Sequence, residues 1–237
     1  MDIYEIEAMR ELKSWQKKMS KKPSIIDKTT KSMQGKFNSF IPEKAHRIIT
    51  ASIKSMTKVV ILGSEFVSKP PLKMVNLKYR EDLVRDKIDS YRKTAATTGA
   101  GTGFGGIVLG MADFPILLSI KIKFLFDVAS IYGFDVKDYR ERLYILYIFQ
   151  LAFSSQEKRN EIYYKILNWD SYVKTLPINK DDFNWREFQQ EYRDYMDIAK
   201  MLQLVPGIGA VVGAYANYKL VSKLGETAMN SYRVRIL

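Results

Sequence analysis

The sequence predicts an all-α protein, a helical bundle, on three observations. Apolar residues recur at the three-to-four-residue spacing of amphipathic helices, as at Ile48, Ile49 and Ile53. Residues that start and stop helices flank such segments: Pro115 suits a first turn and Gly133 a helix end. Alternating valine-rich stretches joined by tight turns, which are typical of β-hairpins, do not occur in the sequence.

The first part of the chain is expected to form three helices. Residues 2–20 and 43–68 are amphipathic, and the loop between them is polar and basic. Two consecutive prolines end the second helix, because the residue before a proline disfavours helical backbone. A third helix begins near Asn76 and continues into a glycine-rich tract, residues 94–112.

Five further helices are expected after that tract. Asp113 can cap the first of them by accepting hydrogen bonds from free backbone amides, and Pro115 then lies in its first turn. Pro177 and many polar residues predict a loop over residues 168–184. The helices are expected over residues 115–132, 136–154, 157–167, 182–203 and 210–230.

The composition excludes several kinds of catalytic and metal site. The 237 residues contain no cysteine, which removes disulfides, thiol nucleophiles and cysteine-ligated metals. The single histidine, His46, lies in an amphipathic segment and fits an ordinary surface position. No nucleophile with an adjacent base is recognisable. We therefore expect no metal and no cofactor, and we favour a protein that is not an enzyme.

The net charge of +12 is concentrated at the start of the chain. Residues 1–93 hold 21 lysines and arginines against 11 acids, whereas residues 94–237 hold 17 against 15. A basic region of this kind suits anionic membrane lipids. Nucleic acid is the competing partner, but no nucleic-acid-binding motif accompanies the charge, so we expect none. The first twenty residues show no cleavable signal peptide, and the N-terminus is expected to stay in the cytoplasm.

The tract of residues 94–112 is uncharged and holds six of the thirteen glycines. Gly101 to Gly106 satisfies the G-x-G-x-x-G pattern, but no strand precedes it, so we discount a nucleotide-binding loop. Small residues at helical spacing instead let a second helix approach closely, and residues 207–216 supply another small-residue segment. The glycines expected at this close contact are Gly99, Gly103, Gly106, Gly110, Gly209 and Gly213.

Two uncharged segments are also long enough to enter lipid. As a helix, the nineteen residues 94–112 would span roughly 28 Å, about the thickness of the hydrocarbon core of a bilayer. Residues 201–218 form a second uncharged stretch. Glycine adds little hydrophobicity, however, and the mean hydropathy of the chain is −0.21. Spanning helices, shallow insertion and a tightly packed soluble core all stay open.

Four residues are candidates for a ligand or helix-junction site: Asp113, Pro115, Arg142 and Asn217. Asp113 either caps a helix or is a buried acid with a basic partner at a helix junction. Asn217 lies among small apolar residues and is expected to bridge helices through its amide. Arg140 and Arg142 are expected to contact Asp113, Asp135 or Asp138 in structural ion pairs.

The first predicted helix suits a membrane surface. An aromatic ring followed by a cluster of lysines is typical of interfacial segments, although an exposed cationic face with a half-buried tryptophan fits equally well. The membrane-surface candidates are Trp15, Lys17, Lys18, Lys21 and Lys22.

With these motifs in order, the chain resembles the EcsC family over nearly its whole length. The glycine-rich tract precedes the first of four matching motifs. They are D-x-P at 113–115, Y-G-x-D at 132–135, P-x-I-G-A-x-x-G-A-x-x-N at 206–217 and S-Y-R-V-R at 231–235.

The resemblance implies an accessory role and no catalytic residues. The family is named after the third gene of an operon whose first two products form an ABC transporter, a system connected with secretion, competence and intramembrane proteolysis. The ATPase and the permease are separate proteins, so the resemblance implies these transporter subunits as candidate partners.

We therefore expect one EcsC-like helical domain over residues 1–237. A basic amphipathic region, residues 1–93, precedes an apolar small-residue core region, residues 94–237. The expected function is that of a non-enzymatic accessory protein of a transporter or secretion system. The expected location is the cytoplasm, peripheral to or shallowly inserted in the inner face of the cell membrane.

Two other functions stay open. One is a soluble protein that binds a lipid or another hydrophobic ligand in an internal cavity. That cavity would be lined by Phe124, Tyr144, Phe149 and Phe153. The other is an acid-assisted hydrolase that uses Asp113.

Overall fold

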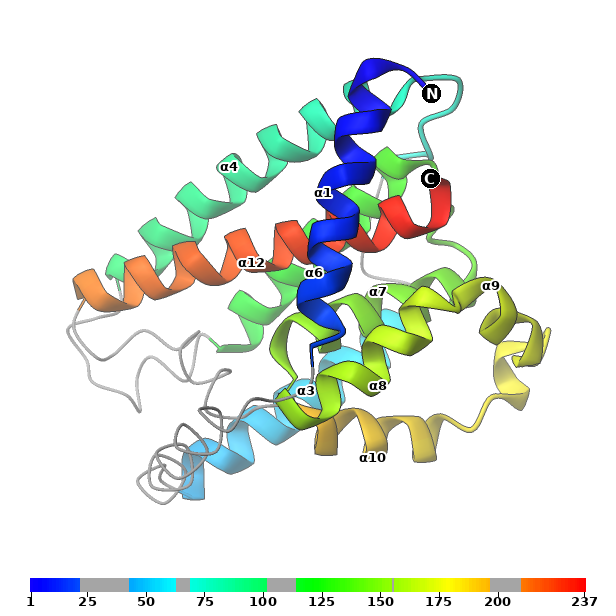
Figure 1. The fold of residues 1–237 in the computed structure, drawn as a ribbon. Helices are drawn as coiled ribbons and strands as arrows, with labels where there is room; N and C mark the ends of the chain where they lie inside the picture. The colour runs from blue at the N-terminus through cyan, green and yellow to red at the C-terminus, as the bar shows by residue number, and fades with distance from the viewer. Residues whose placement is uncertain (22–42, 63–68, 102–113, 155, 197–209) are drawn as a thin grey trace.

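The computed structural model describes residues 1–21, 43–62, 69–101, 114–154, 156–196 and 210–237 (Figure 1). Within these ranges every regular element is a helix, apart from an isolated antiparallel bridge between Ser154 and Met196. The predicted all-α fold class is confirmed for this part of the chain. In chain order the elements are α1 (Ile3–Met19), α3 (Glu43–Leu62), α4 (Leu77–Gly101), α6 (Phe114–Tyr132), α7 (Tyr139–Phe153), α8 (Gln156–Leu167), α9 (Trp169–Tyr172), the 3-10 turns η2 (Val173–Thr175) and η3 (Lys180–Asp182), α10 (Trp185–Tyr195) and α12 (Ala210–Ile236).

The two longest described helices, α4 and α12, lie side by side (Figure 1). They run antiparallel, because Glu81 pairs with Arg233 while Ile88, further along α4, meets the earlier Gly225. A Cβ atom at Gly225 would lie only 2.5 Å from Cδ1 of Ile88. Glycine at this position therefore lets the two helices come closer than any other residue would.

Helix α7 forms the centre of the hydrophobic core. Nearly all of its side chains are buried, because α3, α6, α8 and α12 all pack against it. A helix covered on all sides has no solvent face, which explains why residues 143–153 are apolar apart from Gln150. The Asp138 side chain caps its N-terminus by accepting a hydrogen bond from the backbone amide of Arg140.

Helix α1 covers one side of the bundle, crossing α12 and α8 (Figure 1). It begins with a capping box, in which Asp2 and Glu5 each accept a hydrogen bond from the other's backbone amide. Trp15 is only 4% exposed and packs edge-on against Tyr163 of α8, with the ring centres 5.7 Å apart. Helix α1 is thus joined to the core by its apolar face.

Some helix boundaries differ from the prediction. The segment 168–184, predicted as a loop, contains the short helical turns α9, η2 and η3. Helix α10 ends at Tyr195, so it is shorter than the predicted helix 182–203 within the described residues. Helix α12 continues beyond 230 to Ile236, because Tyr232, Arg233 and Arg235 make buried contacts that stabilise its last turns.

The predicted contact between glycine-rich helices falls largely outside the described residues. Gly103, Gly106, Gly110 and Gly209 lie in the ranges 102–113 and 197–209, which are not described. Gly99 and Gly213 belong to the helical backbone of α4 and α12.

Candidate functional site

A buried ion pair ties the end of α12 to α4 and α1. Arg233 donates from Nε and Nη2 to the two carboxylate oxygens of Glu81, both at 2.6 Å. Glu81 is fully buried and also accepts a 2.6 Å hydrogen bond from the Tyr4 hydroxyl of α1. Arg233 in turn donates to Glu11 at 2.8 Å. The pair is therefore bidentate and hydrogen-bonded at its margins, which is the arrangement that a buried salt bridge requires.

A second buried ion pair uses the neighbouring residues of the same C-terminal motif. Arg235 donates to Glu141 of α7 at 2.7 Å, and the Tyr232 hydroxyl donates to the same carboxylate at 2.8 Å. The Arg235 guanidinium lies 3.7 Å from the ring centre of Phe134. Burial raises the pKa of Glu141, although the positive charge of Arg235 opposes this change. The two arginines of the motif at 231–235 thus pair with two buried glutamates and stabilise the fold.

The Y-G-x-D turn at the end of α6 is built around Gly133. Its φ of +95° lies in the region that favours glycine, and a Cβ there would be 2.9 Å from the carbonyl oxygen of Leu72. Arg80 of α4 donates to the carbonyl of Ile131 at 2.6 Å, and the Leu72 amide donates to the carbonyl of Ser130 at 2.9 Å. These contacts hold the segment before α4 against the end of α6.

A groove of about 730 Å³ lies where segment 69–72, α4 and α6 meet. Its apolar wall includes Leu72, Leu83 and Ile131. Its polar wall combines three lysines with two aspartates and Ser130. The lysines and aspartates are Lys69, Lys87, Lys123, Asp86 and Asp127.

Asp127 organises the polar wall of the groove. It pairs with Lys87 at 3.3 Å and with Lys123 one turn away on α6. The Tyr91 hydroxyl donates to the same carboxylate at 3.3 Å. Ser130 lies one turn further along α6, is 3% exposed, and its Oγ has no hydrogen-bond partner in the part of the chain that the structure describes.

A buried lysine lies between α6 and α12. Lys121 is 1% exposed, and its Nζ donates to the Asn217 side chain at 3.4 Å and to the carbonyl of Leu117 at 3.5 Å. Burial lowers the pKa of Lys121 to about 8. Asn217 therefore connects α12 to α6 through its amide oxygen.

Arg142 does not pair with an aspartate among the described residues, which differs from the expectation. Its guanidinium donates to the carbonyls of Ile61, Val136 and Lys137, at 3.1, 2.9 and 2.6 Å. It joins the end of α3 to the turn before α7. For the neighbouring Arg140 the expectation is confirmed, because it forms an ion pair with Asp138 at 2.9 Å.

The other predicted site residues are scattered. Pro115 lies in the first turn of α6, as its sequence position predicts, while Asp113 and Lys22 lie outside the described residues. Lys17, Lys18 and Lys21 are exposed, whereas Trp15 is buried and its ring is turned into the core. Among the described residues, Arg142 and Asn217 contact different parts of the molecule, the first Ile61 and the turn before α7, the second Lys121 of α6.

The aromatic residues proposed for an internal cavity are part of the packed core. Phe149 and Phe153 lie 4.6 Å apart between ring centres, and the Tyr144 hydroxyl donates to the carbonyl of Ser231 at 2.6 Å. Phe124 packs edge-on against Tyr91 at 5.3 Å. These contacts are those of side chains that fill space, and the groove that the structure does show lies elsewhere.

Sequence reasoning missed Glu81, Lys121 and Ser130. Each lies in a helix beside other polar residues or inside an apolar run, so its burial depends on contacts with distant parts of the chain. One signal was available: Lys121 is the single charge in the largely apolar segment 114–122.

Two further searches cover the described residues alone. No group of three or more histidine, aspartate or glutamate side chains there is placed to hold a metal ion. None of the described helices combines the length and the hydropathy needed to cross a bilayer.

The fold and site define a class of helical protein with buried arginine–glutamate pairs and an amphipathic surface groove. The sequence profile of the EcsC protein family matches residues 6–237, and the chain belongs to that family. It is 46% identical over 230 residues to protein EcsC of Bacillus subtilis (strain 168), covering 97% of this chain and 94% of that protein. It is also 28% identical over 252 residues to the uncharacterized protein YdbA of the same organism, covering 96% of this chain and 90% of YdbA. No solved structure matches the chain.

Proposed function

We propose that this protein is a non-enzymatic accessory protein of an ABC transport or secretion system, associated with the cytoplasmic face of the membrane. Membership of the EcsC family supports the link to such a system. The buried acids Glu81 and Glu141 support a non-catalytic role, because arginines and tyrosines of the bundle hold both of them.

The observation that carries the membrane part of the proposal is the position of two helix ends. Helix α4 ends at Gly101 and α12 begins at Ala210, and these two ends lie at the same end of the bundle (Figure 1). Residues 94–112 and 201–218, the two uncharged stretches, include these helix ends. One end of the molecule is therefore adjacent to both segments that could enter an apolar medium.

The register of α4 against α12 supports close packing at that end. Arg92 donates to Ser222 at 2.7 Å and lies 4.9 Å from the ring centre of Tyr218. Continued along both helices, the same antiparallel register would bring residues around Gly99 opposite residues around Gly213. Small residues on both helices allow their backbones to approach closely, as in membrane helix pairs.

Vesicle flotation tests the membrane association. The full chain is mixed with phosphatidylcholine vesicles, with or without phosphatidylglycerol, and the fraction that floats is measured. We expect flotation with the anionic vesicles. Ile107→Asp, which places a charge in an uncharged stretch, should weaken partitioning roughly tenfold or more, since a buried carboxylate is costly in lipid.

Ile178→Asp is the matched control, because Ile178 is 92% exposed and lies in the connection between η2 and η3. It should float as the wild-type chain does. A wild-type chain that stays at the bottom of the gradient with both vesicle types would contradict the membrane association.

Co-isolation tests the transporter link separately. A tagged chain is recovered from membranes solubilised in mild detergent, and the recovered proteins are identified by mass spectrometry. We expect an ABC transporter ATPase or permease to be enriched over an untagged control. Flotation without this enrichment would overturn the transporter part of the proposal alone.

A further inference from the structure

We propose that the groove between segment 69–72, α4 and α6 binds a single-chain amphiphile with an anionic head group. The alkyl chain would lie on the apolar wall, and the head group would lie among the lysines. This inference is independent of the membrane association proposed above, because it uses a different part of the molecule.

The size and rigidity of the groove fit a small-molecule site. Its volume of about 730 Å³ falls within the range of roughly 300–1,000 Å³ that is typical of ligand pockets. Its walls are held in place by backbone contacts, since the Leu72 amide bonds to Ser130 and Arg80 bonds to Ile131. The glycine conformation at Gly133 completes this corner. The site is therefore formed before any ligand arrives.

The charges of the groove favour an anion. Lys87 and Lys123 both pair with the single carboxylate of Asp127, so one acid is shared between two ammonium groups. Lys69 adds a third positive charge and Asp86 a second negative one, which leaves the wall with a net positive charge. A carboxylate or phosphate head group would balance this charge.

Ser130 supplies an independent sign of a ligand. Its Oγ is buried beside the groove and has no hydrogen-bond partner among the described residues. Buried hydroxyl groups are nearly always hydrogen-bonded in folded proteins. An acceptor oxygen on a bound head group would satisfy this donor.

The apolar part of the groove favours an alkyl chain over a peptide. A peptide brings an N–H and a carbonyl group with every residue, and each needs a partner when it is buried. Two sides of the groove are the helices α4 and α6, whose backbone groups are already bonded within the helix, and the third side, segment 69–72, does not belong to a strand. An alkyl chain needs no hydrogen bonds and can lie against Leu72, Leu83 and Ile131.

A displacement assay tests the proposal on the full chain. The fluorescent fatty acid 11-(dansylamino)undecanoic acid is bound first and then competed with unlabelled compounds. Palmitate or lysophosphatidylglycerol should displace it, and these two arms distinguish a carboxylate head from a phosphate head. Hexadecanol, which has the chain without the charge, and inorganic phosphate, which has the charge without the chain, should both fail.

Three variants locate the site. Lys69→Glu should weaken binding roughly tenfold, about the loss of one charge-assisted contact, whereas the matched control Lys73→Glu, exposed and outside the groove, should not. Leu83→Trp should block the chain by filling the groove. Ser130→Ala should weaken binding without lowering the melting temperature, because the hydroxyl it removes has no partner in the fold.

Several results would overturn the proposal. They are absence of binding by the wild-type chain, equal affinity of Lys69→Glu and Lys73→Glu, full displacement by hexadecanol, or displacement by an apolar peptide but not by palmitate or lysophosphatidylglycerol. If Leu83→Trp lowers the melting temperature, Lys69→Glu and Ser130→Ala still decide the outcome.

Discussion

Lys121 is a charged residue in the core of this protein. It lies on the apolar helix α6, is 1% exposed, and its described hydrogen bonds are long. A buried ammonium group loses its hydration, which is why burial lowers the pKa of Lys121 to about 8. The fold is therefore less stable at neutral pH than it would be with an apolar side chain of similar length.

We predict that Lys121→Met stabilises the protein at pH 7. The pKa of Lys121 is about 8 in the folded state, below its ordinary value of 10.5, so the unfolded state binds more protons between these pH values. Wild-type stability should then rise with pH from about 8 to 10.5, by at most about 3 kcal/mol from this group. Below pH 8 the wild-type protein bears the full free-energy cost of burying the charged ammonium group, and Lys121→Met does not.

Urea unfolding at pH 7 and pH 9.5 measures this difference. The advantage of Lys121→Met should be larger at pH 7 than at pH 9.5, while Lys54→Met, at an exposed position of α3, should show no such change. A variant that is less stable than wild type at both pH values would show that the ammonium group makes a contact the fold requires.

Replacing the buried charge of Arg233, in contrast to that of Lys121, should destabilise the protein. Arg233→Met leaves a fully buried carboxylate without its bidentate partner, which should cost about 3–5 kcal/mol. The midpoint of urea unfolding should fall accordingly, and Arg186→Met, at an exposed position, should leave it unchanged. Adding Glu81→Leu to Arg233→Met should recover part of the loss, because it removes the buried charge that has lost its bidentate partner. No recovery would mean that shape, and not charge, dominates this contact.

At the scale of elements, local pattern predicted where helices exist better than where they end. The helices α1, α6 and α8 begin and end within a few residues of their predicted bounds, because apolar spacing and capping residues are local signals. The end of α12 was missed because buried partners on α4 and α7 stabilise it, and those partners are distant in sequence.

The sequence predicted close helix packing at clustered glycines. Within the described residues, the close contact between α4 and α12 is instead made at a single glycine, Gly225. Gly225 stands among larger residues of α12, and nothing nearby in sequence marks it. Only the position of Ile88 on the facing helix shows why a side chain cannot fit there.

We predict that Gly225→Ala destabilises the protein by about 1–3 kcal/mol, the usual cost of overpacking, despite the better helix propensity of alanine. The new Cβ would meet Cδ1 and Cγ1 of Ile88 at 2.5 and 2.6 Å. Combined with Ile88→Ala, the same substitution should cost less than it does alone, as measured by a double-mutant cycle in urea. Strictly additive effects would show that the helices shift apart freely.

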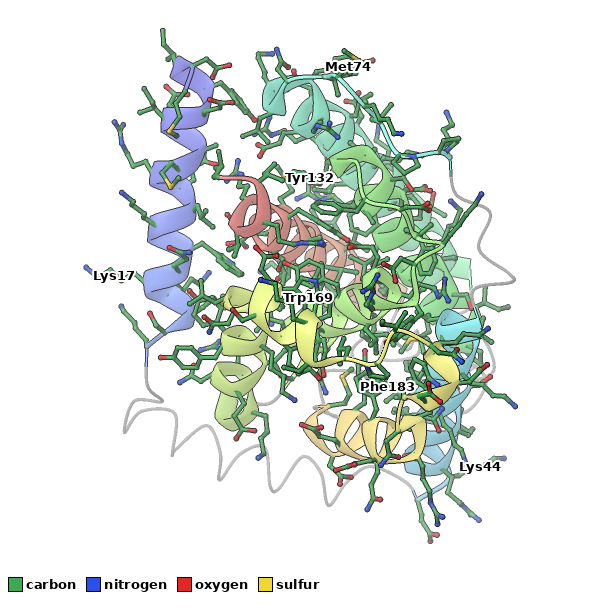
Figure 2. All side chains as sticks on the ribbon, turned by 90° about the vertical axis from the view of Figure 1, so that its right-hand side faces the viewer. Lys17, Lys44, Met74, Tyr132, Trp169 and Phe183 are labelled. Atoms are coloured by element: carbon green, nitrogen blue, oxygen red, sulfur yellow. The ribbon has the colours of Figure 1, made fainter. Side chains whose placement is uncertain are left out.

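At the scale of the whole molecule, the groove could not be predicted from sequence. Its residues come from segment 69–72, from α4 and from the second half of α6, and no local pattern links them. Within the described residues, two lysines of the basic N-terminal third, Lys17 and Lys44, lie on different sides of the molecule (Figure 2). Charge counted along a chain is thus a poor guide to charge on a surface.

If residues 1–237 form one domain, as the sequence predicts, the chain should unfold in a single cooperative transition. Helix α1 packs on α4, α8 and α12, and α7 packs on α3, α6, α8 and α12, so the described helices share one core. The tryptophans report on different parts of it, with Trp15 in α1, Trp169 inside the molecule (Figure 2) and Trp185 at the start of α10. Urea curves from tryptophan fluorescence and from far-ultraviolet circular dichroism should therefore coincide, both in the wild-type chain and in Trp185→Phe. If the wild-type fluorescence changes at lower urea than the helical signal, and Trp185→Phe removes that early change, then α10 and its neighbours unfold as a separate unit and the single-domain prediction is wrong.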